Sequence, residues 1–370
     1  MPESRESPPP VINPNNSQQP INSVRLVWAL GIAQILAWSS TYYLPAVLAT
    51  PISQETGWSL TSVVLGLSWG LLVAGACSPL VGRWIDRYGG RTVLASSSVL
   101  LALGMLLMGA ASHPSTYYLA WTLIGAGMAA GLYDAAFSTL GRLLGSNARG
   151  AMTGLTLLGG FASTLGWPLI AGLEQQIGWR YSCFALAAAH LAIGLPIHLL
   201  AIPNNRHAPA ETAAPASGHS SSSPSKSYPQ LLLLLAMLLT LQSLVISSIS
   251  VHLLDVLKLL GIATATALAI GMLIGPAQVV ARLAELSIGR NLHPTWSTRI
   301  AILLCGLGIA LLLPAIPWLA FVAVALYGAG NGILTIARGT LPLALFGSAG
   351  YGTRMGLLAR PMLWPKPWAR

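Results

Sequence analysis

The stretch GRWIDRYGGR, residues 82–91, concentrates charge in a chain that carries little of it. Only 8% of the 370 residues are charged, yet Arg83, Asp86, Arg87 and Arg91 fall within this short stretch, with apolar runs on both sides. Charges beside apolar surroundings need partners, because an unpaired ion is costly to remove from water. The spacing predicts an ion-paired turn between two helices. Two adjacent glycines, Gly89 and Gly90, are expected to serve its backbone, since glycine adopts positive φ freely.

Asp134 is the second candidate for charge chemistry. It lies within the apolar run GAGMAAGLYDAAFSTLGR, residues 125–142. An ionisable side chain inside a membrane-spanning run usually faces the interior, has a partner and serves a function. Two hypotheses stay open: Asp134 pairs with Arg338 across two halves of the molecule as a gate, or it is a proton-coupling carboxylate. A purely local bond at a helix end is the structural alternative.

The apolar runs that must position these residues are long enough to cross a bilayer, which takes about 20 residues as a helix. With 54% hydrophobic residues, the composition lies outside the range of soluble proteins. Continuous runs favour helices over the alternating strands of a barrel. We expect an all-α polytopic membrane protein with ten complete transmembrane helices and a stump of an eleventh. The predicted spans are 24–48, 60–82, 92–111, 116–141, 150–173, 180–201, 230–254, 262–283, 298–314 and 318–341.

Basic residues are distributed unevenly between the two sides of this predicted bundle. The net charge is +10, and most Lys and Arg residues, Arg282 among them, are assigned to the side of the N-terminus, whereas Arg180 and Lys258 are assigned to the opposite side. This is the positive-inside pattern. It predicts that the N-terminus lies in the cytoplasm. The lipid bilayer, and not nucleic acid, is therefore the expected partner of the basic charge.

The chain divides around a low-complexity stretch. Residues 203–229 are rich in Ser, Ala and Pro and are expected to form a flexible cytoplasmic linker. An N-terminal six-helix bundle is expected at 24–202 and an incomplete C-terminal bundle at 230–370. Residues 1–23 are expected to be a disordered cytoplasmic tail.

An internal repeat supports this division. The stretch RLAELSIGR at 282–290 matches RWIDRYGGR at 83–91 in its first arginine, its carboxylate and its final Gly-Arg. Matching positions in the two halves are offset by 199 or 205 residues. Adding these offsets to position 134 gives positions 333 and 339, and Arg338 lies between them. The offset is the reason for considering these two residues as a pair.

Two six-helix halves with a charged turn after the second helix resemble the major facilitator superfamily. The stretches TGWSLTS at 56–62 and RGAMTGLTLLGGFAS at 149–163 are similar to its monocarboxylate-porter branch and that branch's bacterial relatives. The superfamily signature G-x-x-x-D-R-x-G-x-R is matched by Gly82, Asp86, Arg87, Gly89 and Arg91.

The resemblance implies a gate on the cytoplasmic side. It implies that Asp86 contacts Arg142 or Arg149 and faces the start of an eleventh helix, and that the repeat contributes Glu285 and Arg290. The alternative is that the basic residues only enforce topology, while Asp86 offsets their charge. Only Met355–Trp364 is expected to begin an eleventh helix, and the prolines and cations that follow predict a C-terminally truncated member.

The resemblance also implies a substrate cavity between the halves. Mid-span polar residues are its candidate lining, and an interhelical hydrogen bond is the alternative for each. These residues are Gln34, Tyr42, Tyr133, Gln242 and Asn331. No cation is expected at mid-membrane in these spans, so an anion would depend on neutral donors, helix ends or Arg338.

The resemblance implies secondary active transport of a small solute by alternating access, in a bacterial cytoplasmic (inner) membrane. A small organic acid, alone or with a proton, is the first candidate substrate. Two alternatives stay open: a permease that exports drugs or metabolites, and a non-transporting truncated remnant. No enzymatic, metal or cofactor site is indicated, and a monomer is expected.

Overall fold

The computed structural model describes residues 22–204, 228–289, 292–314 and 316–362. Within these ranges every regular element is a helix. The predicted tail at 1–23 and the predicted linker at 203–229 lie almost wholly outside the described residues.

The first half of the chain forms nine α-helices, with a π-helix at His190–Gly194 between the last two. They are α1 (Ser23–Ser39), α2 (Pro45–Thr56), α3 (Leu60–Tyr88), α4 (Gly90–Gly109), α5 (Pro114–Gly131), α6 (Tyr133–Leu144), α7 (Ala148–Gly159), α8 (Ala162–Ala189) and α9 (Leu195–Ala201). The described part of the second half contains α10 (Tyr228–Leu259), α11 (Thr264–Met272), α12 (Ile274–Ser287), α13 (Pro294–Ala310), α14 (Pro317–Phe346) and α15 (Tyr351–Met362).

The predicted membrane-spanning character agrees with these helices. Among the described residues, 7 helical segments are long and apolar enough to cross a membrane, and α1 and α13 are apolar but shorter. The predicted span 116–141 is broken, because Leu132, with φ −81° and ψ −169°, interrupts the run between α5 and α6. Gly178, with φ 75°, lies inside α8 and falls in the gap predicted between the spans 150–173 and 180–201. A helical membrane protein is thus confirmed, whereas the count of ten complete spans stays a prediction.

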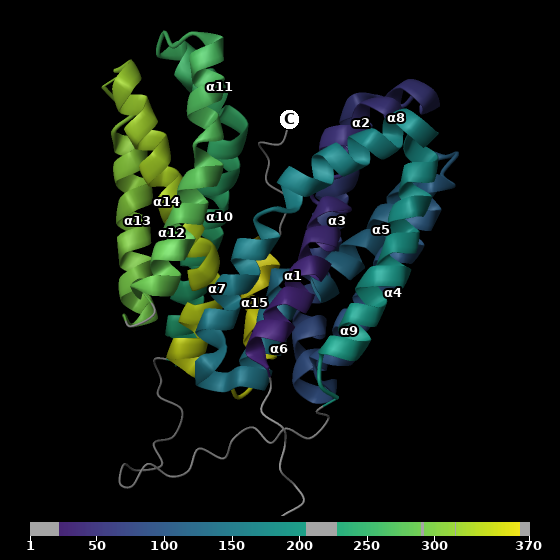
Figure 1. Cartoon of the computed structure of the whole chain (residues 1–370), viewed down its shortest axis with the longest axis horizontal. Helices are drawn as coiled ribbons and strands as arrows, with labels where there is room; N and C mark the ends of the chain where they lie inside the picture. Colours follow the sequence, from purple (N-terminus) through teal and green to yellow (C-terminus); the bar gives the residue numbers. More distant parts are fainter. Residues whose placement is uncertain (1–21, 205–227, 290–291, 315, 363–370) are drawn as a thin grey trace, which may run out of the picture.

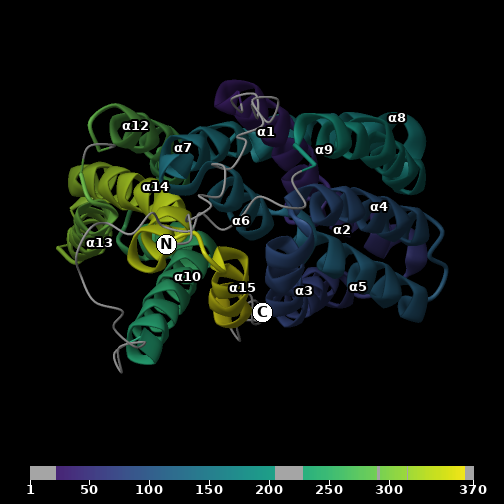
Figure 2. The same ribbon diagram turned by 90° about the horizontal axis from the view of Figure 1, so that it is seen from below.

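The helices form two bundles that meet at one end and diverge at the other (Figure 1). One bundle holds α1–α9 and the other α10–α14. Seen from below, α15 lies between α3 and α10 (Figure 2). The bundles touch mainly where α3 and α6 contact α15, and where α7 contacts α12 and α14.

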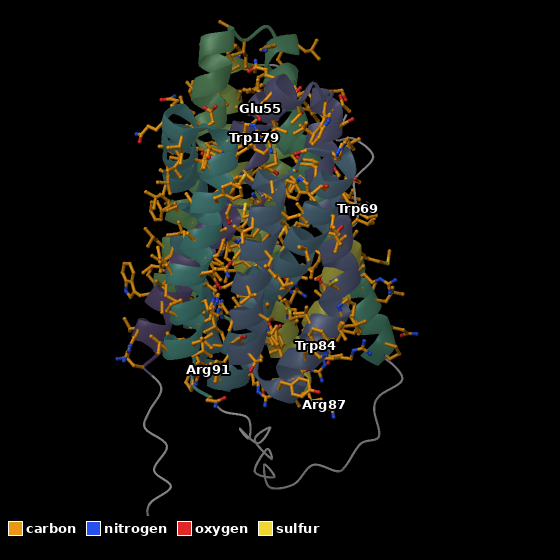
Figure 3. The ribbon with its side chains drawn as sticks, turned by 90° about the vertical axis from the view of Figure 1, so that its right-hand side faces the viewer. Glu55, Trp69, Trp84, Arg87, Arg91 and Trp179 are labelled. Atoms are coloured by element: carbon orange, nitrogen blue, oxygen red, sulfur yellow. The ribbon has the colours of Figure 1, made fainter. Side chains whose placement is uncertain are left out.

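The two ends of the first bundle differ in their charged residues (Figure 3). Arg87 and Arg91 lie at the end where the bundles meet, which we call the basic end. Glu55 and Trp179 lie at the other, the distal end. There Glu55 accepts hydrogen bonds from Trp179 Nε1 at 2.6 Å and Arg180 Nε at 2.7 Å. Arg180 also donates to the carbonyl oxygens of Gly109 and Ala111, which ties α2, α4 and α8 together.

The turn between α3 and α4 assigns different roles to its two glycines. Gly89 has φ 85° and ψ 161°, a conformation that essentially only glycine adopts. Gly90 is the first residue of α4, and a Cβ added there would lie 2.0 Å from Thr139 Oγ1. The expectation that both glycines serve the backbone of the turn is therefore wrong for Gly90, which is required for close packing.

The Gly89 conformation leads to a first prediction. Gly89→Ala should destabilise the protein by about 1 to 3 kcal/mol, because a side chain strains this backbone conformation. The measurement is the melting temperature of the detergent-solubilised protein, followed by tryptophan fluorescence. Gly150→Ala is the matched control, because Gly150 lies in helix α7 with no atom within 4 Å of an added Cβ. Equal melting temperatures for the two variants would contradict the assignment.

The last described helix begins earlier than the sequence predicts. It starts at Tyr351, not near Met355, and follows Gly347 and Gly350, which both have positive φ. Its described length is 12 residues, shorter than the roughly 20 needed to cross a bilayer. Even so, it packs closely along α3.

Candidate functional site

The carboxylate of Asp86 is bound by the first turn of α15. Its oxygens accept hydrogen bonds from the backbone N–H groups of Gly352 at 2.9 Å and Thr353 at 2.7 Å, and from the Thr353 hydroxyl at 2.7 Å. The first N–H groups of a helix have no partner within the helix and carry partial positive charge. Asp86 therefore caps α15 from another element, and this links the two halves of the chain at the basic end.

Small residues allow this approach of α3 to α15. A Cβ added to Gly82 would lie 2.0 Å from the Gly352 carbonyl oxygen, and one added to Gly356 would lie 2.2 Å from that of Ser78. Gly82 and Asp86 are one helical turn apart, so they face the same partner. The spacing of Gly82 and Asp86 thus has a packing reason as well as an electrostatic one.

Arg142 and Arg149, the two arginines expected beside Asp86, make different contacts. Arg142 donates a hydrogen bond to the backbone carbonyl of Asp86, not to its carboxylate. Arg149 forms an ion pair with Glu285 of the repeated stretch. Arg87 stacks on the ring of Tyr88 at 5.3 Å, and Arg290 lies outside the described residues.

The contact between Arg149 and Glu285 is part of a network across the bundles. Arg149 Nη2 also donates to Ser297 Oγ at 3.0 Å and to the Gly289 carbonyl oxygen at 2.8 Å. Ser297 in turn donates to Glu285 at 3.0 Å. The network joins the start of α7 to α12 and α13, and so forms a second link at the basic end.

A third link joins α6 to α14. Asp134 and Arg338 form an ion pair with side chains only 16% and 21% exposed. Asp134 Oδ1 and Arg338 Nε are buried without a hydrogen-bond partner. The Tyr351 hydroxyl donates to the Gly339 carbonyl oxygen at 2.5 Å, so α15 lies beside this pair. Asp134 is also in the first turn of α6, where the positive end of the helix favours a carboxylate.

The break before α6 exposes a carbonyl group that α1 satisfies. Leu132 interrupts the helix, and Gln34 Nε2 donates to the Gly131 carbonyl oxygen at 2.6 Å. Gln34 Oε1 accepts from Trp38 Nε1 at 3.1 Å. Both ends of the Gln34 amide are thus engaged, which is the interhelical role that the sequence left open for this residue.

An aromatic cluster extends from Gln34 toward the distal end. The Trp38 ring lies 5.1 Å from that of Tyr133, 5.6 Å from Tyr42 and 6.2 Å from Tyr43, measured between centroids. Tyr133 is nearly buried, whereas Tyr42 is 43% exposed. Two of the predicted cavity residues therefore belong to one cluster, which the structure extends with Trp38 and Tyr43.

Arg282 is buried, which the sequence did not predict. It is assigned above to a charged turn on the basic side of the bundle, but it is 5% exposed and reaches between the bundles. Its Nη1 donates to the Thr156 carbonyl oxygen of α7 at 2.7 Å, and its Nη2 to Gln278 Oε1 at 3.0 Å. It also lies close enough to Tyr43 and Tyr133 to interact with them electrostatically. A buried cation therefore lies beside the aromatic cluster.

Neighbouring glycines bring Arg282 and Tyr133 together. A Cβ added to Gly159 would lie 2.3 Å from the Tyr133 hydroxyl oxygen, and one added to Gly160 would lie 2.8 Å from Arg282 Nη1. These glycines form the break between α7 and α8. Interrupted helices at membrane depth are where solute sites form in two-bundle membrane proteins, and a guanidinium beside a phenol hydroxyl can bind a carboxylate.

The remaining predicted cavity residues lie on the second bundle. Asn331 is 9% exposed, and its Oδ1 is buried without a partner. The neighbouring Gly332 carbonyl oxygen lies 3.5 Å from Arg282 Nε. Gln242 is half-buried on α10. The structure thus brings α14 near Arg282 at Gly332, the residue after Asn331.

Comparisons with known proteins agree with this architecture. The chain is 32% identical over 168 residues to an uncharacterized 38 kDa protein of Thermoproteus tenax, and 26% identical over 165 residues to the oxalate:formate antiporter of Oxalobacter formigenes. These matches cover 45% and 44% of the chain, but only 44% and 37% of those relatives. The fold is similar to that of the human organic anion transporter MFSD10 (TETRAN), with a TM-score of 0.68, 15% identity and coverage of 93% of this chain and 92% of that one.

A family model identifies the family directly. The model described as Major Facilitator Superfamily matches residues 30–359, which includes both bundles and the first turns of α15. The chain therefore belongs to the Major Facilitator Superfamily of membrane transporters.

Proposed function

We propose that the chain is a secondary active transporter that moves a small organic anion between the bundles by alternating access. The observation that carries the proposal is the position of Arg282, a buried guanidinium beside Tyr133 at the break between α7 and α8. A cation at this depth is costly unless it serves a partner. Its hydrogen-bond partners among the described residues are two carbonyl oxygens and one amide oxygen, none of them charged, so its charge is left for a substrate carboxylate.

The substrates of two similar proteins support an anionic substrate. One transports oxalate and formate and the other organic anions. Both likenesses are distant, and the sequence match to the antiporter covers 37% of its length. We therefore propose an organic acid as the substrate class, and a position near the monocarboxylate-porter branch of the superfamily.

The described conformation fits one step of the transport cycle. We place the basic end in the cytoplasm, because short basic loops remain on the cytoplasmic side. The links through Asp86, Arg149 and Asp134 all lie there. On this assignment the structure is an outward-open state, and the three links form its closed cytoplasmic gate, with units 24–202 and 230–370 as the two moving bundles.

Transport in proteoliposomes tests the proposal. Purified full-length protein should take up labelled small carboxylates, such as formate, lactate or oxalate, and Arg282→Gln should lower the apparent affinity about tenfold to a hundredfold, because a charge-assisted hydrogen bond is lost. Arg299→Gln is the control, since Arg299 is exposed and stacks on Trp296 at 5.0 Å. It should transport normally.

A gentler variant separates binding from folding. Tyr133→Phe removes only the hydroxyl group beside Arg282 and should raise the apparent Km several-fold with an unchanged melting temperature. If Arg282→Gln and Tyr133→Phe both transport carboxylates like the unmodified protein, or if lipophilic cations are transported instead, the organic-anion assignment is wrong.

A further inference from the structure

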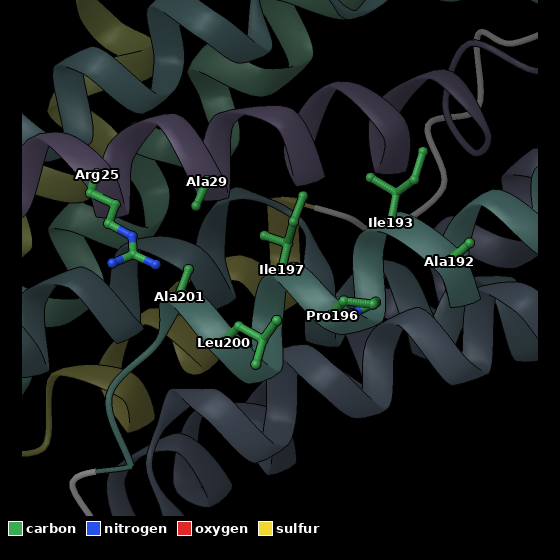
Figure 4. Close-up of a pocket in the computed structure, with 8 residues that line it drawn as sticks. All are labelled: Arg25, Ala29, Ala192, Ile193, Pro196, Ile197, Leu200 and Ala201. Carbon is green, nitrogen blue, oxygen red and sulfur yellow. The ribbon is translucent and has the colours of Figure 1, made fainter.

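A groove outside the transport pathway opens on the surface of the first bundle (Figure 4). It lies between α1 and the segment that contains the π-helix and α9, and has a volume of about 350 Å³. Both walls belong to the same bundle, so the groove faces the surroundings of the protein and not the space between the bundles. The lining residues are Arg25, Ala29, Ala192, Ile193, Pro196, Ile197, Leu200 and Ala201.

Seven of these eight lining side chains are hydrocarbon. The irregular backbone helps to create the depression, because Pro196 has no N–H to donate to the Ala192 carbonyl group four residues earlier, and a wider π turn precedes it. Alanines on both walls leave room that larger side chains would fill. Leu200 is 78% exposed and Ile193 is 47% exposed, as residues in contact with lipid are.

The eighth lining residue is a cation, Arg25. Arg25 is exposed, and it takes part in none of the ion pairs among the residues that the structure describes. Figure 4 shows its guanidinium at one end of the groove, directed toward Ala201, with Ile193 near the other end. The groove therefore presents positive charge at the basic end and apolar surface along the rest of its length.

The dimensions match one leaflet of a bilayer. From Ile193 to Ala201 the helix advances on the order of 12 Å at 1.5 Å per residue, and one leaflet contributes about 15 Å of hydrocarbon. A groove with this length and a terminal cation fits a molecule that has a fatty acyl chain below an anionic headgroup. Basic pockets between transmembrane helices bind such lipids.

We propose that the groove between α1 and α9 is a binding site for an anionic glycerophospholipid, with one acyl chain against Ile193, Ile197 and Leu200 and the phosphate at Arg25. The site is distinct from the region around Arg282. Lipid bound there would fill the seam between α1 and α9 on the membrane side.

Native mass spectrometry of the detergent-solubilised full chain tests this inference, with phosphatidylglycerol and phosphatidylethanolamine of identical acyl chains as probes. The unmodified protein should retain phosphatidylglycerol more than phosphatidylethanolamine. Arg25→Gln should reduce the phosphatidylglycerol preference about fivefold, the effect expected of one basic side chain at the membrane surface. Arg25→Lys should keep most of the preference.

Two further variants test the position of the site. Arg83→Gln removes an exposed cation at the same end of the first bundle, on α3, and should leave lipid retention unchanged. Ala29→Phe should fill the groove and reduce retention of both lipids, with an unchanged melting temperature. Equal retention of the two lipids by the unmodified protein, or an equal loss for Arg83→Gln and Arg25→Gln, would overturn the proposal.

Discussion

Arg338→Gln is expected to lower the stability of the closed basic end by about 3 kcal/mol. Removing one partner of a largely buried ion pair leaves the other charge without compensation, and Asp134 already has one buried carboxylate oxygen without a hydrogen bond. If the pair forms only in the conformer that is closed at the basic end, the ratio of closed to open conformers should fall by about a hundredfold. Spin labels at the exposed positions Arg83 and Arg299 should then report a wider separation at the basic end.

The double variant Asp134→Asn/Arg338→Gln separates the pair from its individual charges. It leaves no unpaired ion, so it should recover much of the lost stability. The exchanged variant Asp134→Arg/Arg338→Asp should recover less, because a cation in the first turn of α6 opposes the positive end of that helix. Equal separations between the spin labels in all of these variants would contradict a gate.

The same variants address the proton-coupling hypothesis for Asp134. If Asp134 carries the coupled proton, Asp134→Asn should abolish the response of transport to a pH gradient, even in the double variant whose stability is restored. If the pair is only a gate, the double variant should keep that response. Measuring uptake with and without an imposed pH gradient therefore decides between the two hypotheses.

Gly82→Ala is expected to displace α15 from α3. The added Cβ would lie 2.0 Å from the Gly352 carbonyl oxygen, so the helices must separate, at a cost of about 1 to 3 kcal/mol. The separation weakens the hydrogen bonds from Gly352 and Thr353 to Asp86. Hydrogen exchange, measured by mass spectrometry on peptides that contain these two amides, should accelerate about tenfold to a hundredfold.

Gly306→Ala provides the matched comparison for this variant. Gly306 lies in helix α13 and has no atom within 4 Å of an added Cβ, so exchange near α15 should not change. Asp86→Asn should accelerate exchange of the same amides without steric displacement, because the charge of their acceptor is lost. Unchanged exchange in both Gly82→Ala and Asp86→Asn would show that α15 is held by other contacts.

The helical class and the family could be predicted because they rest on local patterns. Apolar runs specify membrane helices by length, and the stretch 82–91 is a contiguous signature. The break at Gly178 falls in the gap predicted between two spans, whereas the break at Leu132 could not be predicted in the same way. Leu132 is an ordinary apolar residue, and its extended conformation depends on Gln34 of α1 satisfying the carbonyl group of the preceding residue.

Arg282 shows where the internal repeat misleads. The repeat aligns it with Arg83, which is exposed, and so predicts a loop position for it, although Arg282 is buried. The contrast follows from tertiary packing, since Gly159 and Gly160 open space for Arg282 beside Tyr133. A useful signal was present in the sequence: the five residues AQVVA at 277–281, directly before Arg282, contain no Gly, Pro, Asn, Asp or Ser, which favours a helix interior.

The hydrogen bonds of Glu55 have a mechanical consequence. They tie α2 to α8, and through Arg180 to the end of α4, all within one bundle and at the end farthest from the three links between bundles. Elements joined in this way move together, so any displacement of the first bundle should carry α2, α4 and α8 as one body. The first bundle is thus braced at the end where the two bundles diverge.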